Sequence, residues 1–289
     1  MNAAGTCRTL EEVQKLLRSA SAAVMVGSIT IEPRAGNSGN VYRSGKTYSL
    51  NSLGLPNGGL LYYREETLLK MVSCAYTAGK PLFVSIAGFS PDEYAVLSSF
   101  AFACGADLVE LNLGCPNVWD GSTQKQIPCF DPALVCSILS CVETKVGANA
   151  KISVKISPFS DPYMLSKVVK VIGMSKVVKA VTAVNTFPNA FGYEREGGKL
   201  KPQIGSGNGL AGLGGPVMKS IGLGHIRQLK DLLPSRIQII GVGGITRGTD
   251  VLEYLDSGAC VTQVATAYLE QREGVFSSLL TEMAGSMDD

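Results

Sequence analysis

The 289-residue sequence has few of the residues on which common catalytic and metal sites are built. It has one histidine, His225, which argues against His-based triads and multi-histidine metal sites. Its eight cysteines include no C-x-x-C pair of the kind used by zinc and thiol-redox sites. The net charge of +2 is too small for a nucleic-acid or basic membrane-binding surface. No apolar run reaches the ~18 residues that span a bilayer. We therefore expect a small-molecule ligand and no metal, nucleic-acid or membrane partner.

The composition is otherwise that of an ordinary folded protein, with 45% hydrophobic and 17% charged residues. The first residues, MNAAGTCRTLEEVQ, do not form a signal peptide, so we expect a cytoplasmic protein. In that reducing compartment most cysteines are expected to be free thiols that pack as small buried apolar residues. A length of 289 residues fits two small domains or one α/β barrel, which commonly has ~250 residues.

Short β-branched apolar runs alternate regularly with longer runs of helical period. The strand-like runs cover residues 1–4, 22–30, 81–88, 107–114, 151–157, 178–185, 238–244 and 260–266. The helical runs cover residues 10–19, 63–77, 92–103, 132–145, 164–174, 218–233, 249–257 and 274–284. Eight strand-helix units whose strands are apolar on both faces predict an α/β fold, a single (β/α)8 TIM barrel. An open doubly wound sheet is the alternative.

Three long stretches without a helical pattern follow strand-like runs, at residues 31–61, 115–130 and 186–216. They are expected at the C-terminal face of the strands, where barrel active sites are built. Loops of this length in a compact domain usually have a function. No linker or low-complexity segment marks a second domain, so residues 1–289 are interpreted as one domain.

The segment Glu110-Leu-Asn-Leu-Gly-Cys-Pro-Asn117 ends the fourth strand-like run. A thiol just past a strand end, beside two carboxamides, is placed where a substrate meets a proton acceptor and paired hydrogen-bond groups. A free thiol titrates near ~8.5, which makes Cys115 a candidate acid/base. A structural cysteine in a turn is the alternative.

Two other regions combine glycine with amide or hydroxyl side chains. In residues 51–57, Asn-Ser-Leu-Gly-Leu-Pro-Asn, glycine and proline fix the path so that backbone N–H groups can face an anion, although an ordinary turn has a similar sequence. Glycines in residues 207–215 and 241–244 lie near the last two strands, where phosphate-binding barrels hold phosphate. Turn geometry is again the alternative.

Further polar residues end two central strands. Lys155 is expected to project a cation into the barrel mouth, where it can stabilise developing negative charge. A salt-bridged structural lysine is the alternative. Asn185 and Thr186 close the next strand with an amide and a hydroxyl. The Gly45-Lys-Thr47 sequence lacks P-loop spacing and a following helix, so it is interpreted as a loop. His225 lies in an expected helix and is interpreted as a surface or packing residue.

In their order along the chain, these motifs resemble those of the dihydroorotate dehydrogenase family. The matching segments are Met1-Asn-Ala-Ala-Gly5, Glu32-Pro-Arg-x-Gly36-Asn37, residues 51–57, Ser85-Ile-Ala-Gly88, Asn112-Leu-Gly-Cys-Pro-Asn117, Val184-Asn185 and Gly212-x-Gly-Gly215. Cysteine at position 115 resembles class 1 rather than class 2, and the Gly-Leu-Pro-Asn57 sequence looks most like the fumarate-reducing class 1A.

The resemblance implies a homodimeric FMN enzyme that oxidises dihydroorotate to orotate in pyrimidine biosynthesis, with fumarate, reduced to succinate, as the oxidant. Cys115 is implied as the base, and Lys155 as the group that stabilises the reduced flavin. The residues implied to bind FMN are Ala4, Gly5, Ser28, Asn51, Asn112, Lys155, Asn185, Gly215, Gly243, Gly244, Ala265 and Thr266. Those implied to bind the substrate are Asn51, Gly54, Leu55, Asn112, Asn117, Asn185 and Thr186.

The chain also departs from the family pattern. Gly27 stands where the family has a lysine that contacts flavin and substrate, which is expected to weaken binding of an anionic substrate or to redirect specificity. Lys46 is a possible substitute from the loop. The family segment before the first barrel strand is expected to be missing, and Ala265 replaces a usual glycine.

Two other functions stay open because of Gly27. One is an FMN-dependent dehydrogenase or ene-reductase for a neutral dihydropyrimidine, and the other is an inactive flavin-binding paralogue. The tRNA dihydrouridine synthases share an Asn-x-Gly-Cys-Pro motif, but the near-neutral charge argues against RNA binding.

Overall fold

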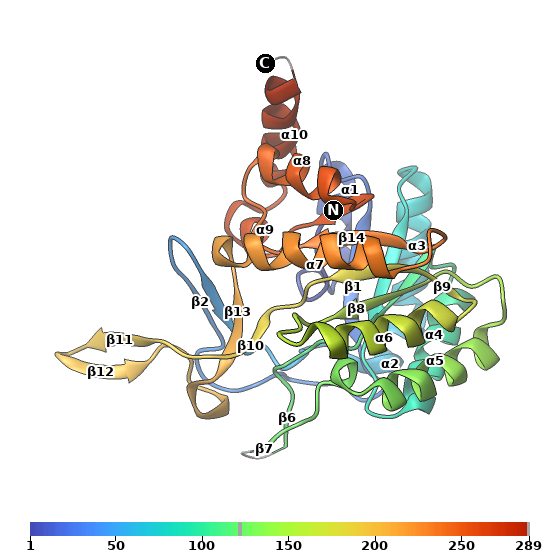
Figure 1. The fold of residues 1–289 in the computed structure, drawn as a ribbon, viewed down its shortest axis with the longest axis horizontal. Coiled ribbons are helices and arrows are strands. Elements are labelled where there is room, and N and C mark those ends of the chain that lie inside the picture. Colours follow the sequence, from blue (N-terminus) through green and yellow to red (C-terminus); the bar gives the residue numbers. More distant parts are fainter. Residues whose placement is uncertain (121–122, 288–289) are drawn as a thin grey trace.

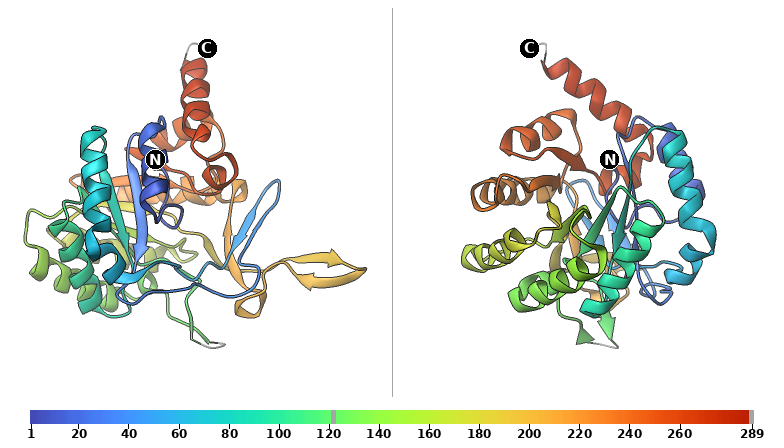
Figure 2. Two further views of the ribbon diagram at one scale, coloured as in Figure 1. Left: turned by 180° about the vertical axis from the view of Figure 1, so that it is seen from behind. Right: turned by 90° about the vertical axis from the view of Figure 1, so that its right-hand side faces the viewer.

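The computed structural model describes residues 1–120 and 123–287. Its centre is a curled sheet of seven parallel strands in the order β1-β4-β5-β8-β9-β14-β15, surrounded by helices (Figures 1 and 2). The strands are β1 (Val24–Ile29), β4 (Leu82–Ile86), β5 (Leu108–Asn112), β8 (Ile152–Ile156), β9 (Val178–Ala183), β14 (Gln238–Val242) and β15 (Val261–Gln263). Each lies within a strand-like run of the sequence, and the expected α/β barrel class is confirmed.

The helices also follow the predicted pattern closely. They are α1 (Leu10–Arg18), α2 (Gly59–Tyr62), the π-helical turn η1 (Tyr63–Thr67), α3 (Leu68–Thr77), α4 (Pro91–Ala103), α5 (Pro132–Val146), α6 (Pro162–Met174), α7 (Lys219–Leu232), α8 (Gly248–Ser257), α9 (Thr266–Gln271) and α10 (Gly274–Met287). Short 3-10 turns are η2 (Pro128–Phe130), η3 (Gly207–Gly209) and η4 (Pro216–Met218). Helices α4, α5 and α6 each begin with a capping side chain followed by proline, which fixes their first turn. Helices α2 and α9 lie outside the predicted helical runs.

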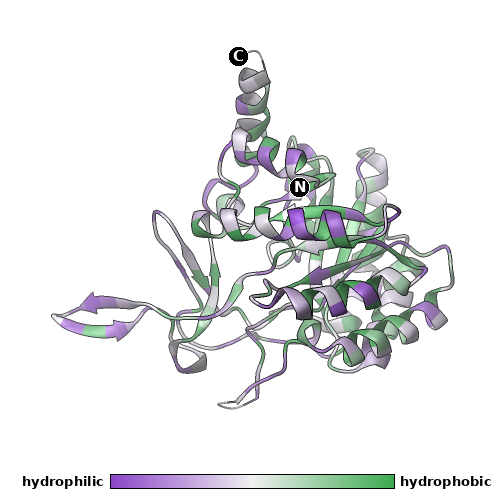
Figure 3. Ribbon diagram, viewed as in Figure 1, coloured by the Kyte–Doolittle hydropathy of each residue, from purple (hydrophilic) through white to green (hydrophobic). Residues whose placement is uncertain are grey.

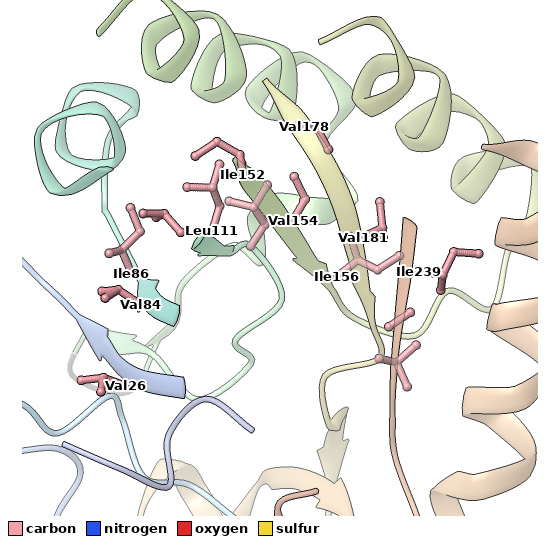
Figure 4. Close-up of a cluster of buried hydrophobic side chains, with 14 of the residues drawn as sticks. Val26, Val84, Ile86, Leu111, Ile152, Val154, Ile156, Val178, Val181 and Ile239 are labelled. Atoms are coloured by element: carbon pink, nitrogen blue, oxygen red, sulfur yellow. The ribbon is translucent and has the colours of Figure 1, made fainter. Parts of the chain in front are cut away.

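The two faces of the sheet differ in polarity. The outer face packs on the helices through buried aliphatic side chains, part of which Figure 4 shows: Val26, Val84, Ile86, Leu111, Ile152, Val154, Ile156, Val178, Val181 and Ile239. On the inner face, Gln263 of β15 donates to Glu110 of β5 at 3.2 Å. Those strands are separated in the sheet order by β8, β9 and β14, so their side chains meet across the barrel interior. The expectation of two apolar faces was wrong for this inner layer.

The first residues of the chain occupy the gap between the edge strands β1 and β15. Asn2 bridges to Val264 in parallel, and Ala3 donates its N–H to the Val264 carbonyl at 2.8 Å. On the other side, the Asn2 carboxamide donates to the Met25 carbonyl at 2.8 Å and accepts from the Met25 N–H at 2.9 Å. The Asn2 side chain therefore takes the place of backbone pairing on the β1 side. The strand predicted at residues 1–4 is reduced to a single bridge at Asn2, which lies between the two edge strands.

The long stretches after the strands contain short antiparallel strands that the sequence did not predict. One four-stranded sheet has the order β10-β13-β3-β2. Its strands are β2 (Tyr42–Ser44), β3 (Ser49–Asn51), β10 (Phe187–Ala190) and β13 (Ala211–Gly214). Two hairpins pair β6 (Trp119–Asp120) with β7 (Thr123–Gln124) and β11 (Tyr193–Glu196) with β12 (Lys199–Pro202). The β11–β12 hairpin projects as an arm that is largely hydrophilic (Figure 3).

The cysteines correct one expectation. All eight are free thiols, but only Cys7 and Cys129 are buried, while Cys136 and Cys260 are exposed. Most were expected to be buried. Helix α5 shows why, because Cys136 follows the buried Val135 and falls on the outer face of an amphipathic helix. In the described part of the chain, no helix is both long and apolar enough to cross a membrane.

We predict that Asn2→Ala lowers the free energy of unfolding by about 2 to 4 kcal/mol, because it leaves the buried Met25 N–H and carbonyl without partners. Urea unfolding followed by circular dichroism measures this. The exposed Asn149 provides a matched control, for which Asn149→Ala changes stability by less than about 0.5 kcal/mol. Equal effects of the two substitutions would contradict this account of the closure.

Candidate active site

Two adjoining cavities lie where the loops after the strands converge with the first residues of the chain. The glycine cavity is lined by Ala3, Ala4, Gly5, Thr6, Tyr42, Ser49, Asn51, Leu53, Lys155, Val184, Asn185, Thr186, Gly214, Gly215, Met218, Val242, Gly243, Gly244, Ile245, Thr246, Gln263, Val264, Ala265, Thr266 and Leu269. The asparagine pocket is lined by Ala4, Gly5, Arg8, Ser28, Asn51, Leu53, Gly54, Leu55, Pro56, Asn112, Cys115, Asn117, Lys155 and Asn185. Six residues line both, so the two spaces share a wall: Ala4, Gly5, Asn51, Leu53, Lys155 and Asn185.

The glycine cavity has a backbone wall and an unpaired polar atom. Gly244 has φ 71°, and a Cβ there would lie 2.5 Å from the backbone nitrogen of Lys219, so no side chain fits. One lining side chain, Gln263, has a buried oxygen, Oε1, with no hydrogen-bond partner among the described residues. Buried polar atoms rarely stay unpaired, so this oxygen indicates a polar ligand.

A network of carboxamides forms the asparagine pocket. Asn117 donates to the Asn51 side-chain oxygen at 2.8 Å, and Asn185 donates to that of Asn112 at 3.1 Å. Asn112 donates in turn to the Ser28 hydroxyl at 3.0 Å. These contacts fix each amide plane, so the remaining donors and acceptors face the pocket in fixed directions. Such a surface complements the alternating N–H and C=O edge of a planar heterocycle.

The small four-stranded sheet positions Asn51 in this network. Asn51 ends β3, where it pairs with Gly212 of β13 and donates to the Gly212 carbonyl at 3.3 Å. The nearby Asn37 donates to the Asn117 carbonyl at 3.1 Å and to the Ser52 carbonyl at 2.8 Å. The loops after β1 and β5 are thereby joined across the mouth of the barrel.

Cys115 is partly buried and lines the asparagine pocket. Burial raises the pKa of this thiol above its usual range, and three groups act in the opposite direction: the Asn117 N–H and the charges of Arg34 and Lys155. Cys115 also lines a third cavity, of about 280 Å³, together with the aromatic side chains of Phe89 and Tyr94. The thiol is therefore mostly protonated at neutral pH and is accessible to a ligand.

Lys155 lines both cavities and faces Glu110. The two side chains are 6% and 0% exposed, and Lys155 Nζ lies 4.0 Å from Glu110 Oε1. The other carboxylate oxygen accepts from the Thr182 hydroxyl at 2.8 Å and from Gln263. Lys155 thus combines the two alternatives seen in the sequence, because it is ion-paired within the barrel and also lines the site.

The structure shows why Gly27 departs from the family pattern and where its possible substitute, Lys46, lies. Gly27 has φ 109°, and a Cβ there would lie 2.2 Å from the Ser85 carbonyl oxygen, so this backbone excludes lysine at position 27. Lys46 lies in the exposed turn between β2 and β3 and lines neither cavity. Arg8 lines the asparagine pocket, although no sequence motif marked it as a site residue.

The structure brings the other predicted site residues together. Ten of the residues expected to bind a cofactor line the glycine cavity, and the remaining two, Ser28 and Asn112, line the asparagine pocket. Of the residues expected to bind substrate, only Thr186 lines the glycine cavity without lining the asparagine pocket. Sequence motifs gave no signal for Tyr42, Ser49 or Thr246, which also line the glycine cavity.

Among the described residues, no group of three or more His, Cys, Asp or Glu could hold a metal ion. His225 is a packing residue that accepts from the Phe159 N–H at 2.8 Å.

The family model for dihydroorotate dehydrogenase matches residues 1–287. Dihydroorotate dehydrogenase A (fumarate) of Lactococcus lactis is 32% identical over 292 residues, covering 100% of this chain and 90% of the relative. A probable dihydroorotate dehydrogenase A (fumarate) of Streptococcus pneumoniae is 30% identical, covering 99% of this chain and 88% of the relative. A solved DHODH of Eimeria tenella, in complex with ferulenol, shares the fold with a TM-score of 0.82 at 18% identity, covering 99% of this chain and 80% of that one.

The family match and the names of the curated relatives identify an oxidoreductase that acts on CH–CH bonds. The chain belongs to the dihydroorotate dehydrogenase family, whose members are flavin-dependent in general, and it is similar to the class 1A enzymes within it.

We predict that Glu110→Gln lowers the free energy of unfolding by about 3 to 5 kcal/mol, because it leaves the Lys155 ammonium buried without a counter-charge. The double variant Glu110→Gln/Lys155→Met is expected to recover much of this loss, since it removes both charges. Chemical unfolding of both variants measures the coupling. Additive losses would contradict an interaction between the two groups.

Proposed function

We propose that this protein catalyses the FMN-dependent oxidation of dihydroorotate to orotate. The observation that carries the proposal is the common wall of the two cavities. A ligand in the asparagine pocket contacts Cys115 and also reaches the residues that line the glycine cavity, Lys155 and Asn185 among them. A proton acceptor and a hydride acceptor are therefore available to one substrate molecule.

The residues of the glycine cavity fit FMN. Gly215, Gly243, Gly244 and the Ala265–Thr266 segment would hold the phosphate and ribityl chain, since their backbone leaves room for close approach. The unpaired oxygen of Gln263 offers an acceptor to a polar atom of the ligand. Ala4, Gly5 and Lys155 would contact the flavin ring near the shared wall. The other proposed contacts are Ser28, Asn51, Asn112 and Asn185.

The chain's own residues bind the substrate and move its proton. Asn51, Asn112, Asn117 and Asn185 would hold the pyrimidine ring through its N–H and C=O groups, with Gly54, Leu55 and Thr186 at its edges. In its deprotonated form Cys115 would accept the proton from C5, which leaves the electron pair to form the C5=C6 double bond as the hydride departs from C6. When bound, FMN supplies the acceptor for that hydride. The Lys155 cation stabilises the negative charge that develops beside it.

The oxidant in this proposal is fumarate, which would be reduced to succinate after orotate leaves. The similarity to two relatives named as fumarate enzymes supports it. The reaction would serve pyrimidine biosynthesis. The cytoplasmic location and the homodimer stay predictions. A neutral dihydropyrimidine is the second candidate substrate, favoured by the exclusion of a lysine at Gly27.

An anaerobic titration of the FMN-loaded protein tests this function. Dihydroorotate is expected to bleach the flavin absorption, and fumarate is expected to restore it. Bleaching by dihydrouracil but not by dihydroorotate would favour the neutral substrate. A protein that retains no FMN after reconstitution would contradict the proposal.

We predict that Cys115→Ser slows flavin reduction by dihydroorotate about 10²- to 10⁴-fold at neutral pH, because serine is a far weaker proton acceptor. Since burial raises the pKa of Cys115, its deprotonated form becomes more abundant as pH rises. The wild-type rate is therefore expected to increase from pH 6 to pH 9, and stopped-flow absorbance measures it. A pH profile unchanged by the substitution, or an unchanged rate, would remove Cys115 from the reaction.

A further inference from the structure

Backbone hydrogen bonds to Gly27 hold the segment that precedes Arg8, a residue that lines the asparagine pocket. Gly27 donates its N–H to the Cys7 carbonyl at 2.9 Å, and its own carbonyl accepts from Gly5. The chain from Gly5 to Cys7 is therefore pinned against the end of β1, and Arg8 is the next residue. Gly27, whose backbone excludes a lysine from β1, thus also holds the segment that brings Arg8 to the asparagine pocket.

The backbone of Arg8 is fixed on both sides, so its guanidinium has a defined origin. Its N–H donates to the Glu12 carboxylate at 2.7 Å, and its carbonyl accepts from the Tyr63 hydroxyl at 3.0 Å. Within the described part of the chain, the Arg8 guanidinium donates one hydrogen bond, from Nη1 to the Pro56 carbonyl at 3.3 Å. That partner is neutral and occupies one of five N–H donors. The others are available to a ligand.

The charges around the asparagine pocket leave Arg8 uncompensated. Of the two cations that line it, Lys155 faces the Glu110 carboxylate at 4.0 Å. No carboxylate is among the described residues that line the pocket, and the Glu12 carboxylate accepts from the backbone N–H groups of Arg8 and Thr9. An anion in the pocket would therefore be attracted by Arg8, which lines it, and by Arg34, which does not line it but donates to the Gly54 carbonyl at 3.0 Å. A partly buried guanidinium forms strong charge-assisted hydrogen bonds to a carboxylate.

We infer that Arg8 is the specificity-determining residue that binds the carboxylate of the substrate. The inference rests on the proposed function and deepens it, since it selects a carboxylated dihydropyrimidine over a neutral one. Arg8, which precedes α1, supplies the pocket with a positive charge. Neither Gly27 nor Lys46 supplies one there. It acts in binding, and the proton and hydride transfers stay with the groups already described.

The test compares binding of orotate with binding of uracil, which is the same ring without the carboxylate. Calorimetry on the FMN-loaded protein gives both dissociation constants for wild type, Arg8→Gln and Arg8→Lys. Arg8→Gln is expected to weaken orotate binding about 10- to 100-fold and to change uracil binding less than about threefold. Arg8→Lys is expected to recover part of the loss, because the charge is kept and the fork geometry is not.

Lys15→Gln provides the matched control, since it removes an exposed cation from α1, the helix that follows Arg8, and is expected to leave both constants unchanged. Equal weakening of orotate and uracil by Arg8→Gln would show that Arg8 only supports the loop at Pro56, and this would overturn the inference. Unchanged orotate binding, or a wild type that does not bind orotate, would overturn it as well. If orotate binding depends on Arg8 but dihydroorotate does not bleach the flavin, the carboxylate site stands and the proposed oxidation fails.

Discussion

The pairing of the first residues with the two edge strands is the constraint on which the site depends. Asn2 connects β15 to β1 through its backbone on one side and its carboxamide on the other. This places Ala4 and Gly5 in the shared wall of the two cavities. The Cys7 bridge to Gly27 then directs Arg8 into the asparagine pocket. A buried side chain with all its hydrogen bonds made holds such an arrangement rigidly, because each lost partner carries a desolvation cost.

The barrel interior beneath the site is polar, and its charges are balanced in pairs or networks. Glu110 carries a negative charge at the centre, where Lys155, Thr182 and Gln263 face it. The ammonium of Lys155 is consequently held at the junction of the cavities with its charge largely offset. Cys115, by contrast, lies in surroundings that raise its pKa, so it holds its proton until a ligand or higher pH changes the balance. The site therefore combines a fixed cation with a group that can exchange a proton.

The regular alternation of strands and helices could be predicted because each β-strand carries an aliphatic outer face and each helix a matching apolar side. The motif around Cys115 and the glycine loops could be placed at one end of the barrel because parallel strands end at the same face. The short strands β10 and β13 could not be predicted, since Phe187–Ala190 and Ala211–Gly214 lack an alternating apolar pattern. Arg8 could not be found either, because its position depends on a backbone bridge between residues distant in sequence. The polar inner face of the barrel could not be predicted, because single polar residues such as Ser153 and Thr182 occur within strands that are otherwise apolar. These two side chains become hydrogen-bonded partners only in the folded barrel.

We propose that one planar substrate lies between Cys115 and a flavin held in the glycine cavity, with its carboxylate toward Arg8. A crystal structure of the protein with FMN and orotate is the decisive experiment. We expect the FMN phosphate beside Gly215 and Gly244, and the orotate carboxylate about 3 Å from the Arg8 guanidinium. We also expect C5 of the ring to face the Cys115 sulfur. An FMN bound outside the glycine cavity, or an orotate whose ring has no contact with Cys115, would show that the proposed arrangement is wrong.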